Sequence, residues 1–240
     1  MHWRAVLAGA LLCAPLPAAA DVTARYQLGS EELSVEVDDG GDYRVELAGQ
    51  FMLLRRAGAE YVVIFQQSEP CVVERQAFLD LVAAKLRSDT PRSLATQQNL
   101  ALAKVGDEAV GGRRGTLWTA GIDKPGANKI EAVMSADPDL APVGKILAGT
   151  VDSALRAFGD VLPMANLGDT MRELFAKGTP LRFVLMAEVR LKSVSTTAID
   201  AARFALPGPV IDASTLDSKL SSKRTTATVV VPTPPPPPRP

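Results

Sequence analysis

Very few side chains of this sequence could act as nucleophiles, general bases or soft metal ligands. The 240 residues include one histidine, His2, and two cysteines, Cys13 and Cys71. A Ser–His or Cys–His nucleophile pair needs a histidine as its base, and histidine is also the commonest zinc ligand. Two of these three residues lie in the first 20, so the chemistry open to the protein depends on how that segment is processed.

Residues 1–20 have the order of a secretory signal peptide. Arg4 precedes the apolar run 5–14, and Ala18-Ala19-Ala20 supplies small residues for a signal peptidase. The run is far shorter than the ~20 apolar residues of a membrane-spanning helix. We therefore predict cleavage after Ala20 and a periplasmic or secreted protein. A second reading is a lipoprotein acylated on Cys13, although Leu12 is not the small residue that such a site needs before the cysteine.

Cleavage would remove His2 and Cys13 and leave Cys71 alone. We expect Cys71 to be a small buried apolar residue; the alternative is an intermolecular disulfide. Loss of Arg4 leaves 25 basic against 27 acidic side chains, so the net charge moves from −1 to −2. This balance favours neither nucleic acid nor anionic surfaces. The sequence therefore predicts a protein that is not an enzyme, carries no cofactor and binds no nucleic acid.

Two kinds of charged cluster remain. Asp38-Asp39-Gly40-Gly41-Asp42 places three carboxylates on one turn, and carboxylates are calcium ligands. The spacing fits no EF-hand, and Asp and Gly are also typical hairpin-turn residues, so we predict no metal site. The pairs Arg55-Arg56 and Arg113-Arg114 could contact an anionic headgroup or simply keep a strand edge solvated.

The first half of the mature chain has the pattern of an antiparallel meander followed by a helix. Alternating apolar residues and glycine turns predict strands over 22–28, 33–37, 43–47, 51–54 and 61–65. The last two strands are apolar on both faces, which predicts a central position with a cover on each side. Residues 74–87 have a helical apolar stripe. Strands are expected over 100–105, 115–120 and 129–135.

The second half begins with a strong helix signal. Asp137 is a typical N-cap and Pro138 a typical first helical residue. Apolar residues then recur three or four apart up to Leu162, and Gly144 and Gly149 within this helix suggest close packing. Further elements are a helix over 167–177, one long strand over 181–192 and a last strand over 195–206.

Residues 211–240 are rich in Ser, Thr and Pro, and we predict that they form a disordered tail. The prolines 234–238 favour an extended polyproline II conformation. Such a segment could bind a cell-envelope protein or act as a spacer.

The order of elements predicts an α+β domain over residues 21–210, with helices on one face of a large antiparallel sheet. Four segments resemble the LolA-like superfamily of exported lipoprotein carriers, lipid-binding lipoproteins and related periplasmic families: Gly106–Gly112, Ile130–Met134, Gly178–Leu181 and Phe204–Gly208. The resemblance implies a curved sheet, or half-barrel, closed by helices, and no catalytic residues.

The resemblance also implies an apolar hollow that holds a lipid or acyl chain. The candidate lining residues are Phe51, Leu53, Tyr61, Val63, Trp118, Phe183 and Leu185. Apolar strand faces also form ordinary filled cores. The alternative function is therefore a cell-envelope interaction protein with a filled core, which binds a protein partner through its surface or its tail.

Overall fold

The computed structural model describes residues 21–66, 69–89, 100–121, 129–158, 166–185 and 187–226. The predicted signal peptide and the proline run lie outside the described residues. Within helix α4 (Ala213–Thr226), side chains are described up to residue 221.

Eleven strands form one open antiparallel sheet in the order β6-β5-β4-β3-β2-β1-β11-β10-β9-β8-β7. The strands are β1 (Val22–Leu28), β2 (Glu31–Val37), β3 (Tyr43–Leu47), β4 (Phe51–Arg56), β5 (Ala59–Gln66), β6 (Glu69–Glu74), β7 (Ala101–Val110), β8 (Arg113–Gly121), β9 (Ile130–Ser135), β10 (Thr179–Val184) and β11 (Glu188–Ser195). The meander β1–β6 makes one end of the sheet and β7–β9 the other. The β10–β11 hairpin joins the two.

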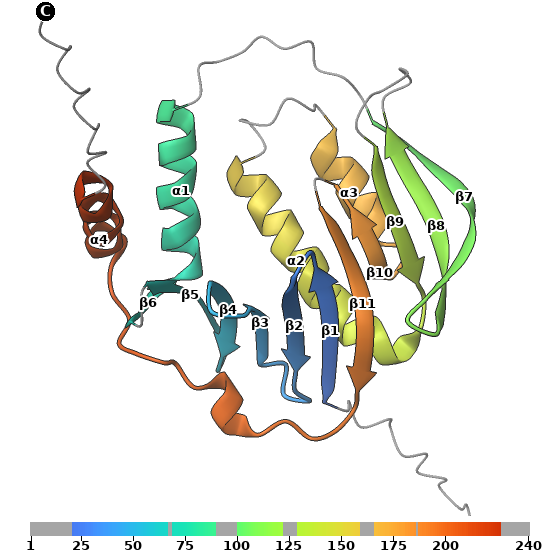
Figure 1. The fold of residues 1–240 in the computed structure, drawn as a ribbon, viewed down its shortest axis with the longest axis horizontal. Coiled ribbons are helices and arrows are strands. Elements are labelled where there is room, and N and C mark those ends of the chain that lie inside the picture. The colour runs from blue at the N-terminus through green and yellow to red at the C-terminus, as the bar shows by residue number, and fades with distance from the viewer. Residues whose placement is uncertain are drawn as a thin grey trace, which may run out of the picture.

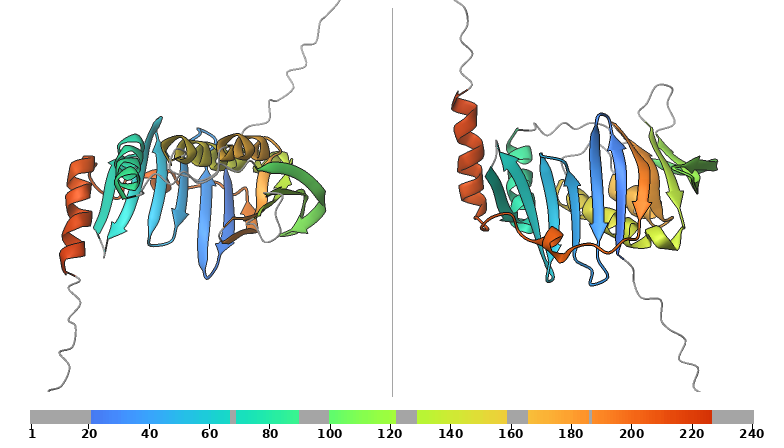
Figure 2. Two further views of the ribbon diagram at one scale, coloured as in Figure 1. Left: turned by 90° about the horizontal axis from the view of Figure 1, so that it is seen from above. Right: turned by 60° about the horizontal axis from the view of Figure 1, so that its bottom comes forward.

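Three helices cover one face of this sheet: α1 (Arg75–Asp89), α2 (Ala141–Phe158) and α3 (Leu167–Phe175). Figure 2 shows them as a layer along one side, with α4 standing beside the β6 edge. In Figure 1 the sheet curves, most strongly at β7 and β8. The predicted α+β class, with a curved sheet under helices on one face, is confirmed.

Local signals fix the junction between the helices and the middle of the sheet. Asp137 accepts a hydrogen bond from the Asp139 amide at 3.0 Å and caps the short 3-10 turn η1 (Pro138–Leu140), which continues into α2. Gly144 lies against β10, because a Cβ there would lie 2.3 Å from Thr179 Oγ1. Gly178 has φ 136° and would place a Cβ 2.0 Å from the Ser135 carbonyl oxygen. Both glycines are therefore required by close approach.

A segment over residues 196–211, here called the strap, crosses the face opposite the helices (Figure 2). Its 3-10 turn η3 (Ala201–Phe204) buries Phe204 against Met52, Leu54 and Val63. This cover explains why β4 and β5 are apolar on both faces. They are not central, however. They are the second and third strands from the edge strand β6, and that edge is covered because the Ile211 amide donates to the Val72 carbonyl at 2.8 Å.

Three expectations about the C-terminal part were wrong. The apolar run 181–192 is two strands, β10 and β11, and the three residues between them in the sequence include no glycine or proline. Residues 196–206 belong to the strap and are not a strand. Residues 213–226, which we expected to be disordered, form α4. Leu216 of α4 is fully buried in the main core, and Leu220 packs beside it, so this helix is part of the domain.

Candidate ligand site beside helix α3

The seven candidate lining residues do not line one hollow. Phe51 and Leu53 pack in the main cluster under the helices, whereas Tyr61 and Val63 pack on the opposite face with Phe204. The register explains the split. Phe51 pairs with Ile64 and Leu53 with Val62, so residues 61 and 63 point the other way. Leu185 is 38% exposed at the β10–β11 turn. Trp118 and Phe183 lie in a further cluster, next to α3.

The middle of the sheet is a filled core. Leu140 and Val143, at the start of the α2 segment, have no exposed surface and pack with Tyr26 and Leu181. Tyr26 also donates a hydrogen bond to the Pro180 carbonyl at 3.1 Å. Cys71 is buried in the same cluster, 3% exposed, as the sequence predicted. The helix-facing side of this part of the sheet is therefore structural core.

Helix α3 covers a separate and smaller cluster. Leu167, Met171 and Leu174 recur three or four residues apart and face the sheet. On the sheet side, Ala120 and Ala132 are small, so larger neighbours such as Trp118 and Phe183 complete the layer and stay partly exposed. Pockets lie on both flanks of this helix.

The first pocket, here called the sheet pocket, has a volume of about 600 Å³. It is lined by strands β7–β9 and by the residues that follow α3: Asp107, Glu108, Ala109, Arg114, Gly115, Thr116, Trp118, Met134, Ala136 and Lys177. Lys177 Nζ lies 4.9 Å from the centre of the Trp118 ring, in cation–π contact. Trp118 Nε1 is buried, and it is the only buried side-chain polar atom of the described residues without a hydrogen-bond partner.

The second pocket, here called the helix pocket, has about 340 Å³ and separates α3 from α2. Its walls are mostly apolar and include Val151, Leu155, Met171 and Phe175. Asp152 lies at the rim, 3.4 Å from Arg172 Nε. Concave sites with apolar walls and a few polar groups are typical of small-molecule binding.

The acidic residues of the sheet pocket already have partners. Glu108 accepts two hydrogen bonds from Arg182, at 3.0 and 3.2 Å, and Arg182 also lies 3.5 Å from Glu131. Burial lowers the pKa of Arg182, but these carboxylates raise it by more. Asp107 accepts from Thr116 Oγ1 at 3.2 Å and lies 3.8 Å from Lys104. The basic residues of the pocket are Arg114, which is exposed, and Lys177, whose ammonium is 3.4 Å from Glu173.

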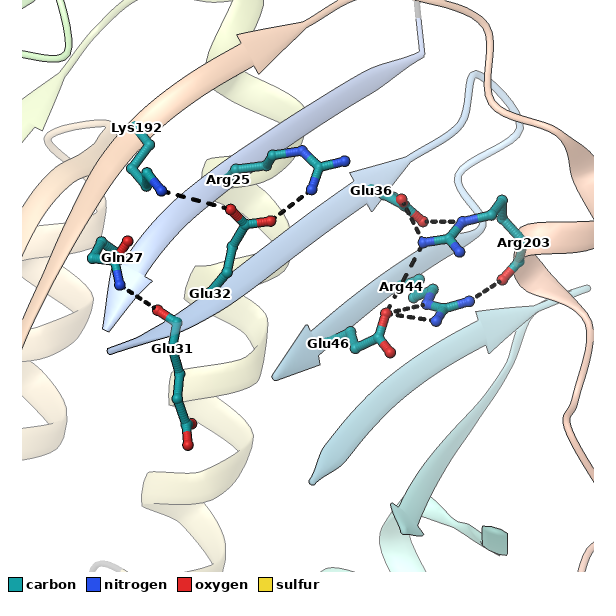
Figure 3. A network of polar contacts seen from close by, with 9 residues as sticks. All are labelled: Arg25, Gln27, Glu31, Glu32, Glu36, Arg44, Glu46, Lys192 and Arg203. Atoms are coloured by element: carbon teal, nitrogen blue, oxygen red, sulfur yellow. Dashed lines mark hydrogen bonds and ion pairs between the residues drawn. The ribbon is translucent and has the colours of Figure 1, made fainter. Parts of the chain in front are cut away.

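The remaining charge clusters brace the fold. On the face away from the helices, Arg203 of the strap donates to Glu36 at 2.8 and 3.2 Å, and Arg44 donates to the Arg203 carbonyl at 3.1 Å (Figure 3). Arg25 and Lys192 pair with Glu32 on the same face. The contacts of Arg203 join the strap to the strands, and the pairs of Glu32 join β1, β2 and β11 to one another.

A second brace lies at the α1 end. Glu60 accepts from Tyr43 at 2.6 Å and from Arg75 at 2.7 Å, and Arg75 also donates to the Gly149 carbonyl of α2 at 3.3 Å. Burial and the Glu60 hydrogen bond raise the pKa of Tyr43 above its usual value. The group ties β3, β5, α1 and α2 together.

The acidic turn over residues 38–42 has a structural role. Asp38 accepts from the Asp42 amide at 2.7 Å, and Asp42 accepts from the Ala57 amide at 2.9 Å. Across the parts of the chain that the structure describes, there is no group of three or more side chains arranged to hold a metal ion. The same parts contain no helix with both the length and the apolar character needed to cross a bilayer.

Solved structures that are similar to this chain include one of MucB and one of MucB in complex with MucA(peri). The first is 15% identical with a TM-score of 0.31, covering 79% of this chain and 57% of MucB. The second is 14% identical with a TM-score of 0.29, covering 76% and 52%. The chain thus spans little more than half of the MucB length. No protein-family model and no curated protein matches significantly.

The sequence pointed to part of the site only. It singled out Trp118 and Phe183 from the resemblance, and Arg114 as one of a basic pair. It placed Met171 and Phe175 on the inward side of the predicted helix over 167–177 but gave no binding role to them or to Lys177. The sequence did place Lys177 at the C-terminal end of the predicted helix, directly before Gly178, where that helix ends.

Proposed function

We propose that the protein is a non-enzymatic, exported binding protein that holds an apolar chain, such as an acyl chain, beside helix α3. The ligand lies in the sheet pocket on Trp118 and Met134 and reaches toward the cluster under α3. The filled main core cannot serve as the hollow that the family resemblance implied. The sheet pocket and the helix pocket flank α3, and we therefore place the proposed site at this end of the sheet.

One observation carries the proposal: the large apolar side chains of the second cluster are incompletely covered. Trp118 and Phe183 retain exposed surface, and pockets of about 600 and 340 Å³ lie on either side of the short helix above them. Volumes of this size suit small ligands. The absence of histidine from residues 21–240 and the burial of Cys71 support a role without nucleophilic chemistry.

The test is binding of a fluorescent fatty acid to the mature protein and to two matched variants. Thr116 lines the sheet pocket, so Thr116→Phe fills it and should weaken binding at least tenfold. Thr119 lies on the same strand with its side chain on the other face, so Thr119→Phe adds the same bulk away from the pocket and should leave binding unchanged. Absence of binding to the wild-type protein, together with no lipid in solvent extracts of the natively purified protein, would contradict the proposal.

A second candidate function is binding of a cell-envelope protein, and the β7 edge favours it. Strand β7 ends the sheet, and no strand of the described residues pairs with its outer side, whereas the β6 edge is covered by the strap. Val105 on β7 is 59% exposed. Unpaired strand edges bind extended peptides by adding a strand. The occupant would be an extended segment with an apolar residue placed against Val105.

This candidate is tested by co-purification with a cross-linked partner from the native envelope. Val105→Lys should abolish recovery of a partner that pairs with β7, whereas Leu86→Lys, at a similarly exposed apolar position on α1, should not. Removal of residues 227–240 tests the tail separately. The truncation keeps α4, because Leu216 belongs to the core. Equal recovery with all variants would exclude both routes.

A further inference from the structure

We infer that the sheet pocket selects an amphiphile with an oxyanion head, a carboxylate or a phosphate, which is held by Trp118 Nε1–H, Lys177 and Arg114. This inference rests on the proposed function and adds the chemical class of the ligand. It concerns the polar rim of the pocket, which an apolar chain alone would leave unused.

The first observation is the indole N–H of Trp118. Its nitrogen is buried and has no acceptor, although buried donors in native proteins nearly always have one. A buried donor without a partner is unfavourable, so the position is expected to have a purpose. The indole group is a donor only, and the partner it lacks is therefore an acceptor, such as an oxyanion.

The second observation is the balance of charge around the pocket. Glu108 is held by Arg182, and Asp107 by Thr116 and Lys104. Both carboxylates therefore have their own donors. Lys177 contacts the Trp118 ring and only the exposed Glu173 at 3.4 Å. For Arg114, no ion pair is found within the described residues. The groups available to a ligand are thus two cations and an N–H donor.

The third observation is the placement of these groups relative to apolar surface. Trp118, Met134, Ala109 and Ala136 line the same pocket as Lys177 and Arg114. A ligand with a head at the cations can lay its chain on the indole ring and Met134. The Lys177 side chain is long and unbranched, so it can move from the ring to the head and free the indole for contact.

The experiment compares three ligands with the same chain: decanoate, decyl phosphate and decan-1-ol. Affinities are measured by calorimetry at pH 7.5 with the full mature protein. We expect both anions to bind about tenfold tighter than the alcohol, which is the size of one charge-assisted hydrogen bond. The better of the two anions identifies the head, carboxylate or phosphate.

Variants assign the preference to the pocket. Lys177→Gln, Arg114→Gln and Trp118→Phe should each reduce the ratio of anion to alcohol affinity while the alcohol still binds. Lys192→Gln and Arg25→Gln remove the same charges on the opposite face and should leave the ratio unchanged. Thermal denaturation confirms that each variant is folded.

The outcomes separate the inference from the function it rests on. Equal binding of the three ligands, or an anion preference that falls equally in Lys177→Gln and Lys192→Gln, overturns the inference and leaves the acyl-chain function intact. Absence of binding by all three ligands overturns both. Tighter anion binding that is lost only in the pocket variants supports both.

Discussion

The two ends of the sheet are built differently. One end is covered on both faces and supports the fold, whereas the other carries the proposed binding site. At the β1–β6 end, α1 covers one face and the strap the other, and ion pairs such as Arg203–Glu36 fasten the layers. At the β7–β10 end, the nine residues of α3 give a smaller cover flanked by pockets. Filled regions carry stability, so a region with open apolar surface is where binding is expected.

The largest expected effect is on the free energy of unfolding, when one phenylalanine from each end of the sheet is replaced by alanine. Phe204 is 3% exposed in the strap cluster, so Phe204→Ala should lower the free energy of unfolding by about 3–5 kcal/mol. Phe175 lines the helix pocket and is only half-buried. Phe175→Ala should therefore lower the free energy of unfolding by less than half as much. Urea denaturation of both variants measures the difference. Equal losses would mean that the α3 end is as tightly packed as the strap end.

The next effect uses two glycines of α2. Gly144 contacts β10, and the added Cβ of Gly144→Ala would lie 2.3 Å from Thr179 Oγ1. We expect a loss of about 1–3 kcal/mol from this overpacking. Gly149 has no atom within 4 Å of its Cβ position, so Gly149→Ala should gain up to about 1 kcal/mol of helix propensity. Thermal denaturation should give shifts of opposite sign; shifts of the same sign would contradict the packing described here.

These elements also show what could be read from the sequence. The glycine turns of the meander, the Asp137 cap and the close approach of Gly144 follow from local chemistry and were predicted. Gly149 was expected to mark close packing as well, and it does not. The lining residues were assigned by apolar character, but the face that each one occupies depends on strand register, which places 51 and 53 opposite 61 and 63.

The C-terminal errors have a similar cause. The sequence between β10 and β11 is apolar, so it continues the strand pattern. Helix α4 is polar except for Leu216 and Leu220, yet those two residues are four apart and follow Asp212, whose carboxylate accepts from the Thr215 amide at 2.7 Å. The Asp212 cap and the spacing of the two leucines could therefore have predicted a helix. The helix is stabilised by burial against α1 and β6, and the composition of the segment does not show that these elements lie beside it.

The smallest expected effect concerns the Tyr43–Glu60–Arg75 brace. Burial raises the pKa of Glu60, but hydrogen bonds from Tyr43 and Arg75 lower it by more, so the net pKa lies below 4.5. The carboxylate therefore stabilises the fold fully above pH 4.5, and this contribution is lost as the pH falls through the folded pKa. Because Glu60 is partly exposed, we expect less than about 1 kcal/mol. Wild type should lose more stability than Glu60→Gln between pH 7 and 3; an identical loss would show that the brace contributes nothing.

The most direct test of the α3 site uses Trp118, because residues 21–240 contain no other tryptophan. Its indole N–H should give a single resonance in a ¹⁵N–¹H spectrum, which can be followed as decanoate is added. We predict a saturable shift of this resonance and of amides in α3, with the amides of Phe204 and Leu54 unchanged. A Trp118 resonance that does not move, or shifts centred on the strap, would contradict the account.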